Sequence, residues 1–256
     1  CTKVGLLDVP FLPLEDGTMV IPKEQNVYFP LGKGKKYGFE QDLRILDVEL
    51  FDFDKEDSPK IAEFLSAAGV LTDNPYDMIV GHILPKHVSD EWMSMDKKSL
   101  LGHLLYIKEK CDDYVAGAAQ QWQSEADALK SLSEKLYIGT KENRDGSWLF
   151  DKAENLYVGD AYHPEFPIEK YLDTLLKPAS FVSEEYLPTK SKNEPEVAAS
   201  WRGFFARLGI RDTPKVFSAQ HDWHCSVELV TLLGSSDAKV RVDTLDRKST
   251  RLNSSH

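Results

Sequence analysis

Residues 16–29 read DGTMVIPKEQNVYF, and residues 145–158 read DGSWLFDKAENLYV. Aligned without gaps, the two stretches are identical at five of their fourteen positions, and four more positions exchange similar residues. The first stretch belongs to a block of short predicted strands around a turn at residues 15–17, where Gly17 can adopt a positive φ. A repeat of this kind predicts an α+β chain built from two related units.

The helical parts of the sequence repeat in the same order. Residues 58–70 read SPKIAEFLSAAGV and residues 194–210 read EPEVAASWRGFFARLGI. Each stretch has Pro near its start and Gly where a left-handed C-terminal residue belongs, at Gly69 and Gly209, and Ser58 is a candidate N-cap. Each is followed by Asp-x-Pro and a second predicted helical run, at 76–84 and at 215–219. Shared capping chemistry explains single matches, but two blocks in one order favour duplication.

The segment between the repeats is predicted to be helical. Its apolar residues fall close to a three-four spacing along one stripe, at Leu101, Leu104, Cys111, Val115, Ala118, Trp122 and Leu129. This spacing predicts either one long amphipathic helix or a helical hairpin broken near Gly117. The expected organisation is a first α+β unit at 1–93, the connecting helix or hairpin at 94–136, and a second, truncated α+β unit at 137–245.

The two ends of the sequence are expected to be artificial boundaries. Residues 246–256, DRKSTRLNSSH, correspond in frame to the codons of a common adapter from sequencing libraries, so we expect native sequence to stop at Leu245. The chain opens on Cys1 without an initiator Met, which indicates a fragment of a longer protein.

Charge and cysteine content limit the expected partners and compartment. The net charge is −11, and without residues 246–256 the 28 basic and 41 acidic residues give −13. An acidic surface repels phosphate backbones and anionic lipid, so neither nucleic acid nor a membrane is an expected partner. Three widely separated cysteines form no disulfide framework, which favours an intracellular location, cytoplasm or nucleus.

Two stretches imitate cofactor motifs but lack a required residue. The stretch PLGKGKKYG at 30–38 has Lys36 where a phosphate-binding loop needs Ser or Thr. The stretch DFDKEDSPKIAE at 52–63 alternates acidic residues, but Asp57 stands at the sixth position, where a calcium loop needs Gly. We therefore expect no cofactor in this chain.

The stretch AQHDWHCSVE at 219–228 contains the best nominal cluster for metal binding or nucleophilic catalysis. His221, His224 and Cys225 could serve a metal- or thiol-dependent hydrolase, but no spacing elsewhere completes a recognisable zinc set. Structural or surface roles are the simpler interpretation of these three residues. This hydrolase and a stand-alone protein-binding domain are the two alternatives to a non-catalytic module of a larger protein.

Six stretches together carry a family resemblance: 11–29 (FLPLEDGTMVIPKEQNVYF), 64–75 (FLSAAGVLTDNP), 100–109 (LLGHLLYIKE), 156–172 (LYVGDAYHPEFPIEKYL), 181–187 (FVSEEYL) and 200–210 (SWRGFFARLGI). This combination resembles the region downstream of the ATPase domain in sacsin-like and NO VEIN-like proteins. The resemblance implies a segment of a very large protein with an Hsp90-like nucleotide-binding domain and a chaperone or scaffold role.

That ATPase family is marked by an E-x-x-x-N box and a D-x-G-x-G loop, and neither occurs in this chain. The resemblance therefore implies a non-catalytic module, with ATP and magnesium bound in a preceding domain of the parent protein. Its expected partners are other domains of that protein and protein clients. The expected client surface includes Trp201, Phe204 and Phe205, which read as exposed aromatic residues.

Overall fold

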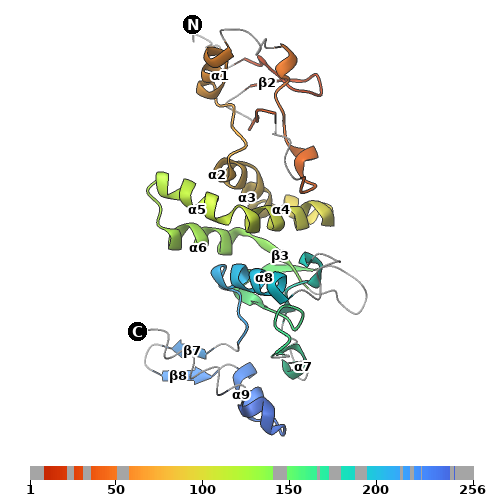
Figure 1. The fold of residues 1–256 in the computed structure, drawn as a ribbon, viewed down its shortest axis with the longest axis vertical. Coiled ribbons are helices and arrows are strands. Elements are labelled where there is room, and N and C mark those ends of the chain that lie inside the picture. The colour runs from red at the N-terminus through yellow and green to blue at the C-terminus, as the bar shows by residue number, and fades with distance from the viewer. Residues whose placement is uncertain are drawn as a thin grey trace. The chain divides into compact units, whose positions relative to one another are not determined.

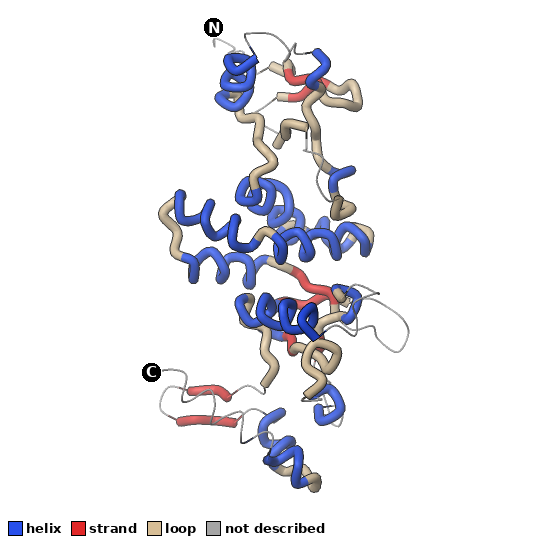
Figure 2. The backbone as a smooth tube through the Cα atoms, viewed as in Figure 1, coloured by secondary structure: helices blue, strands red, loops and turns tan. Residues whose placement is uncertain are grey.

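The computed structural model describes residues 9–21, 26–30, 36–50, 58–140, 149–165, 168–172, 180–187, 195–213, 216–219, 222–225, 227–242 and 245. Helices and short strands occur together, which confirms the α+β class (Figures 1 and 2). The chain divides into two compact units, Cys1–Ala128 and Leu129–His256. The first unit thus takes in most of the segment predicted at 94–136 to be a separate connection.

Unit 1 combines one short hairpin with a series of helices. Its elements are β1 (Leu12–Pro13), β2 (Met19–Val20), η2 (Glu40–Asp42), η3 (Val48–Leu50), α1 (Ser58–Ala67), α2 (Pro75–Met78), the π-helix η4 (Ile79–Ile83), α3 (Leu84–Val88), η5 (Asp90–Met93), α4 (Lys97–Glu109), α5 (Cys111–Gln120) and the first residues of α6 (Glu125–Lys135).

The described part of unit 2 contains three strand pairs. Its elements after α6 are β3 (Tyr137–Gly139), β4 (Phe150–Lys152), η6 (Ala153–Asn155), β5 (Leu156–Tyr157), α7 (Ile168–Leu172), β6 (Ser180–Phe181), η7 (Glu184–Tyr186), α8 (Pro195–Arg207), β7 (Val216–Ala219), β8 (Asp222–Cys225) and α9 (Val227–Leu233). β3 pairs with β4 and β7 with β8 in antiparallel register, whereas β5 and β6 are parallel.

Each unit contains a hairpin held to a later extended segment by a similar antiparallel bridge. In unit 1, β1 pairs with β2, and Leu14 forms an antiparallel bridge to Leu46. In unit 2, β3 pairs with β4, and Thr140 forms an antiparallel bridge to Val182. The turn of the first hairpin has Gly17 at φ +82°, as predicted.

A tyrosine lies at the centre of both frames. Tyr28 forms parallel bridges to Ile45 on one side and Leu71 on the other. Tyr157, its partner in the sequence alignment, pairs in parallel with Phe181 in β6 and forms a parallel bridge to Arg211. A parallel neighbour needs a crossover connection, and the connections to Leu71 and Arg211 contain α1 and α8 respectively.

Both crossover helices end in the same way. Gly69 lies at φ +100° and Gly209 at φ +79°, which confirms the two predicted left-handed caps. The next residue donates its backbone N–H back to the helix, from Val70 to the Leu65 carbonyl and from Ile210 to the Phe205 carbonyl. Because Gly has no Cβ, it takes this conformation at little steric cost and redirects the chain into the strand.

The prediction of one helix, or of two broken near Gly117, is wrong. The chain is interrupted at Lys110 and again at residues 121–124, which gives α4, α5 and α6. Gly117 lies inside α5, where α2 packs closely against it. A Cβ at Gly117 would lie 2.5 Å from Tyr76 Cβ. Its missing side chain thus permits close helix packing and does not end the helix.

Helix α5 ends at an unusual residue. Trp122 has φ +63°, and two hydrogen bonds close the turn, from Trp122 N to the Ala119 carbonyl and from Gln123 N to the Ala118 carbonyl. This is the Schellman pattern with Trp where Gly is usual. Trp122 is 97% exposed, so it does not belong to the buried stripe predicted to include it.

The helical run predicted at 215–219 is also wrong. Val216–Ala219 form strand β7, which pairs with β8 from Val216 opposite Cys225 to Ala219 opposite Asp222. β-Branched and aromatic residues such as Val216 and Phe217 suit a strand, and pairing with a segment six residues away decides the outcome. The run predicted at 76–84 is helical, with Asn74 as N-cap accepting from Asp77 N.

Candidate functional site

The cluster predicted around His221 cannot be assembled from the described structure. His221 lies outside the described residues, and so do the side chains of His224 and Cys225, whose backbone forms the end of β8. Among the described residues, no three His, Cys, Asp or Glu side chains are grouped closely enough to hold a metal ion. The cluster therefore stays a prediction.

The aromatic residues predicted to form an exposed surface are buried. Trp201 is 2% exposed, Phe204 5% and Phe205 0%. Within unit 2, Tyr186 packs 5.5 Å from Trp201 and Tyr162 lies edge-on 5.3 Å from Phe205, measured between ring centroids. The expected surface is thus the inner face of α8, because large apolar rings are stabilised by about 1.5–3 kcal/mol each when they leave water.

The opposite face of α8 carries small residues and a hollow. Ala199, Gly203 and Ala206 are exposed along this face. Together with Val158 and Ile210 they line a hollow of about 310 Å³, to which Arg202 and Asp212 also contribute. Val158 directly follows β5, so the hollow lies where this central strand ends beside the crossover helix.

An ion pair lies at the edge of this hollow. Arg202 donates from Nε at 3.1 Å and from Nη2 at 2.7 Å to a single oxygen of Asp212, Oδ2. The Asp212 side chain is 9% exposed and that of Arg202 is 38% exposed. Two donors on one buried acceptor hold the guanidinium group in a fixed orientation at the surface.

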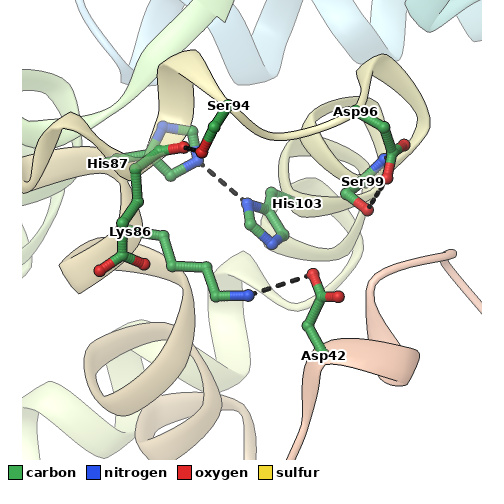
Figure 3. Close-up of polar contacts among 8 residues, drawn as sticks. Asp42, Lys86, His87, Ser94, Asp96, Ser99 and His103 are labelled. Atoms are coloured by element: carbon green, nitrogen blue, oxygen red, sulfur yellow. Dashed lines mark hydrogen bonds and ion pairs between the residues drawn. The ribbon is translucent and has the colours of Figure 1, made fainter.

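A second polar cluster lies inside unit 1 and consists of three histidines. His82 comes from η4, His87 from α3 and His103 from α4, and they are 8%, 1% and 0% exposed. His87 Nε2 lies 3.1 Å from His103 Nδ1, and Figure 3 shows the two rings directed toward one another. We call these three residues the histidine cluster.

A proline explains why His82 lies in a π-turn. Pro85 has no N–H, so it cannot bond the carbonyl of Gly81 four residues earlier. That carbonyl accepts instead from the side-chain amide of Asn26. The helix widens over Ile79–Ile83, and His82 stacks on Phe39 with ring centroids 5.8 Å apart. Turns of this kind occur often at functional sites.

Burial keeps His82 and His103 neutral. Desolvation lowers the pKa of His82 to about 3, and the nearby Lys86 ammonium acts in the same direction. Desolvation also lowers the pKa of His103 to about 2, with contributions from His87, His82 and Lys86. Lys86 pairs with Asp42 at 3.1 Å, as Figure 3 shows. Imidazoles with such pKa values are uncharged near pH 7 and keep one N–H each, so these residues join helices by packing and hydrogen bonding.

The sequence contained partial signals for both sites. Pro85 within a helical run indicated an irregular helix, but nothing local showed that His82 and His103 would meet. The pattern of α8 identified its aromatic residues, yet the side of α8 that is covered depends on Tyr162 and Tyr186, which lie elsewhere in the chain.

Comparisons with known proteins found no match: no protein-family model matches the chain, and neither does any curated protein or solved structure. A membrane-crossing helix, which needs a long apolar run, does not occur among the helices of the described residues.

Proposed function

We propose that this chain is a non-catalytic structural and interaction module of a larger chaperone-like or scaffold ATPase. The observation that carries the proposal is the duplicated frame. Each unit has a hairpin, a central strand with a tyrosine, and a crossover helix ended by a left-handed glycine. Repeated small frames of this kind serve well as spacers and binding surfaces, since each repeat offers a separate helix face.

The electrostatics of the described residues support a structural role. The histidines with the most strongly lowered pKa values are packed among aromatic rings in unit 1, where they bind helices together. A general acid or base would need a pKa near the working pH. In unit 2, α8 combines an inner aromatic face with an open outer face, which suits a module that presents a surface.

Sequencing the gene beyond both ends tests the link to an ATPase. The proposal expects an E-x-x-x-N box and a D-x-G-x-G loop upstream, in the same reading frame. A nearby start codon without these motifs would contradict it and favour a stand-alone binding domain.

Binding to an unfolded protein tests the interaction role. The full chain should bind β-casein, which has no stable fold, and should not bind folded lysozyme, when each is immobilised for surface plasmon resonance. Binding to neither protein would contradict client presentation. Stoichiometric zinc in the purified chain, together with ester or peptide hydrolysis lost in Cys225→Ser, would favour the hydrolase instead.

A further inference from the structure

The residues that line the hollow beside α8 differ from those at the corresponding positions of unit 1. With Gly69 aligned to Gly209, the exposed positions Ala199, Gly203 and Ala206 correspond to Pro59, Glu63 and Ser66 of α1. With Tyr28 aligned to Tyr157, Val158 corresponds to Phe29. The side chains at all four of these positions are smaller in unit 2 than in unit 1.

The ion pair is peculiar to unit 2 as well. Arg202 and Asp212 correspond to Ala62 and Thr72 in unit 1, neither of which carries a charge. Asp212 occupies Nε and Nη2 of Arg202, and within the described part of the chain Arg202 makes no further hydrogen bond. The two N–H groups of its Nη1 atom therefore remain as donors at the edge of an apolar hollow.

The size of the hollow restricts what it can hold. Cofactor and drug-sized ligands occupy pockets of roughly 300–1,000 Å³, so about 310 Å³ lies at the lower limit and accommodates one apolar side chain together with the backbone that carries it. Its walls are mainly aliphatic, from Val158, Ala199, Ala206 and Ile210. A guanidinium group fixed beside such walls recognises a carboxylate next to an apolar group.

We propose that the hollow between α8 and the end of β5 binds a partner polypeptide through one leucine-sized side chain, with Arg202 donating to an adjacent carboxylate. Asp212 is a positioning residue that fixes the guanidinium group. This inference rests on the proposed interaction function and names the surface and the peptide chemistry that would serve it.

Peptide titration of the full ¹⁵N-labelled chain, followed by NMR, tests the proposal. The probes are acetylated, amidated hexapeptides: Gly-Ser-Leu-Glu-Ser-Gly, a second with Ser in place of Leu, and a third with Gln in place of Glu. We expect the first peptide to shift the amide signals of Ala199, Gly203 and Asp212. The other two peptides should bind about tenfold more weakly, since each loses a buried side chain or a charged partner.

Gly203→Leu provides a variant that fills the hollow without disturbing the fold. A Cβ at Gly203 meets no atom within 4 Å, and Leu is a better helix former than Gly. This variant should weaken binding of the first peptide at least about tenfold. The matched control is Glu63→Leu, which changes the corresponding exposed position of α1 and should leave binding unchanged. Arg202→Gln should remove the preference for Glu over Gln while retaining the preference for Leu over Ser.

Several outcomes would overturn the proposal. These are unchanged binding by Gly203→Leu, equal binding of the Leu and Ser peptides, and no shift with any peptide. Binding of β-casein by both the natural chain and Gly203→Leu would retain the interaction function while excluding this hollow as its site. If the unsubstituted chain does not bind β-casein, the proposed interaction function itself is contradicted.

Discussion

Units 1 and 2 share several backbone bridges and a helix cap but place their polar groups differently. Unit 1 buries the histidine cluster among the helices that follow its frame, whereas unit 2 places Arg202 and Asp212 at the open face of its crossover helix. In both, Tyr28 or Tyr157 is bridged on two sides, and Gly69 or Gly209 ends the helix. A few turn, cap and strand positions thus maintain a frame while the surrounding side chains diverge.

The largest expected difference between the two units is in how strongly acid lowers their free energy of unfolding. His82 and His103 have folded-state pKa values of about 3 and about 2, below the value of about 6.5 for an unfolded chain. Their contribution to stability is complete above pH 6.5 and is lost as pH falls toward the folded-state values, because the unfolded state takes up the protons first. At pH 4.5 the two groups should lower the free energy of unfolding of unit 1 by about 5 kcal/mol.

Hydrogen exchange measured by mass spectrometry from pH 7.5 to 4.5, corrected for the intrinsic pH dependence of exchange, would follow this loss. Peptides from 75–109 should lose protection more steeply than peptides from 195–213. His82→Phe should reduce the slope of the free energy of opening against pH in peptides from 75–109. The reduction should be about 1.4 kcal/mol per pH unit, since the variant removes one of the two titrating groups. Equal slopes in the two units would exclude the histidine cluster as the cause.

Alanine substitution at one helical glycine in each unit should have opposite effects. At Gly117 the new Cβ would overlap Tyr76, so Gly117→Ala should lower the free energy of unfolding by about 1–3 kcal/mol. At Gly203 nothing lies within 4 Å, so Gly203→Ala should raise it by up to about 1 kcal/mol. Urea unfolding followed by circular dichroism measures both changes. Stabilisation by both variants would show that α2 does not pack closely on α5.

Matched substitutions at the two helix caps should have matched effects. Gly69→Ala and Gly209→Ala each force a Cβ into a left-handed conformation, so each should lower the free energy of unfolding by about 1 kcal/mol. Local hydrogen exchange at residues 64–71 and 204–211 would report the two losses separately. A lower free energy of unfolding in one unit alone would indicate that the two helix caps do not contribute equally to stability.

The smallest expected change concerns the cap that uses tryptophan. Trp122→Gly should raise the free energy of unfolding by about 0.5 kcal/mol, because relief of the left-handed strain exceeds the greater flexibility of glycine in the unfolded chain. The side chain is 97% exposed, so little burial is lost. A decrease in the midpoint of urea unfolding would mean that Trp122 makes a stabilising contact in solution.

Local signals were sufficient for part of the fold. The positive φ at Gly17, Gly69 and Gly209 follows from the residues on either side, since turns and caps satisfy backbone groups within a few positions. Pro at the start of a predicted helix likewise identified α1 and α8. The α+β class followed from these signals together.

The remaining features depend on contacts between residues far apart in the chain. Gly117 has no room for a side chain because Tyr76, from α2, packs against it. The aromatic residues of α8 showed that one face is apolar, but Tyr162 and Tyr186 cover that face and leave the small residues open. The histidine cluster likewise joins α3 to α4 across sixteen residues. The sequence alone determined where elements turn and stop, because those interactions are local; the tertiary structure decided which faces are buried, since burial depends on partners distant in the sequence.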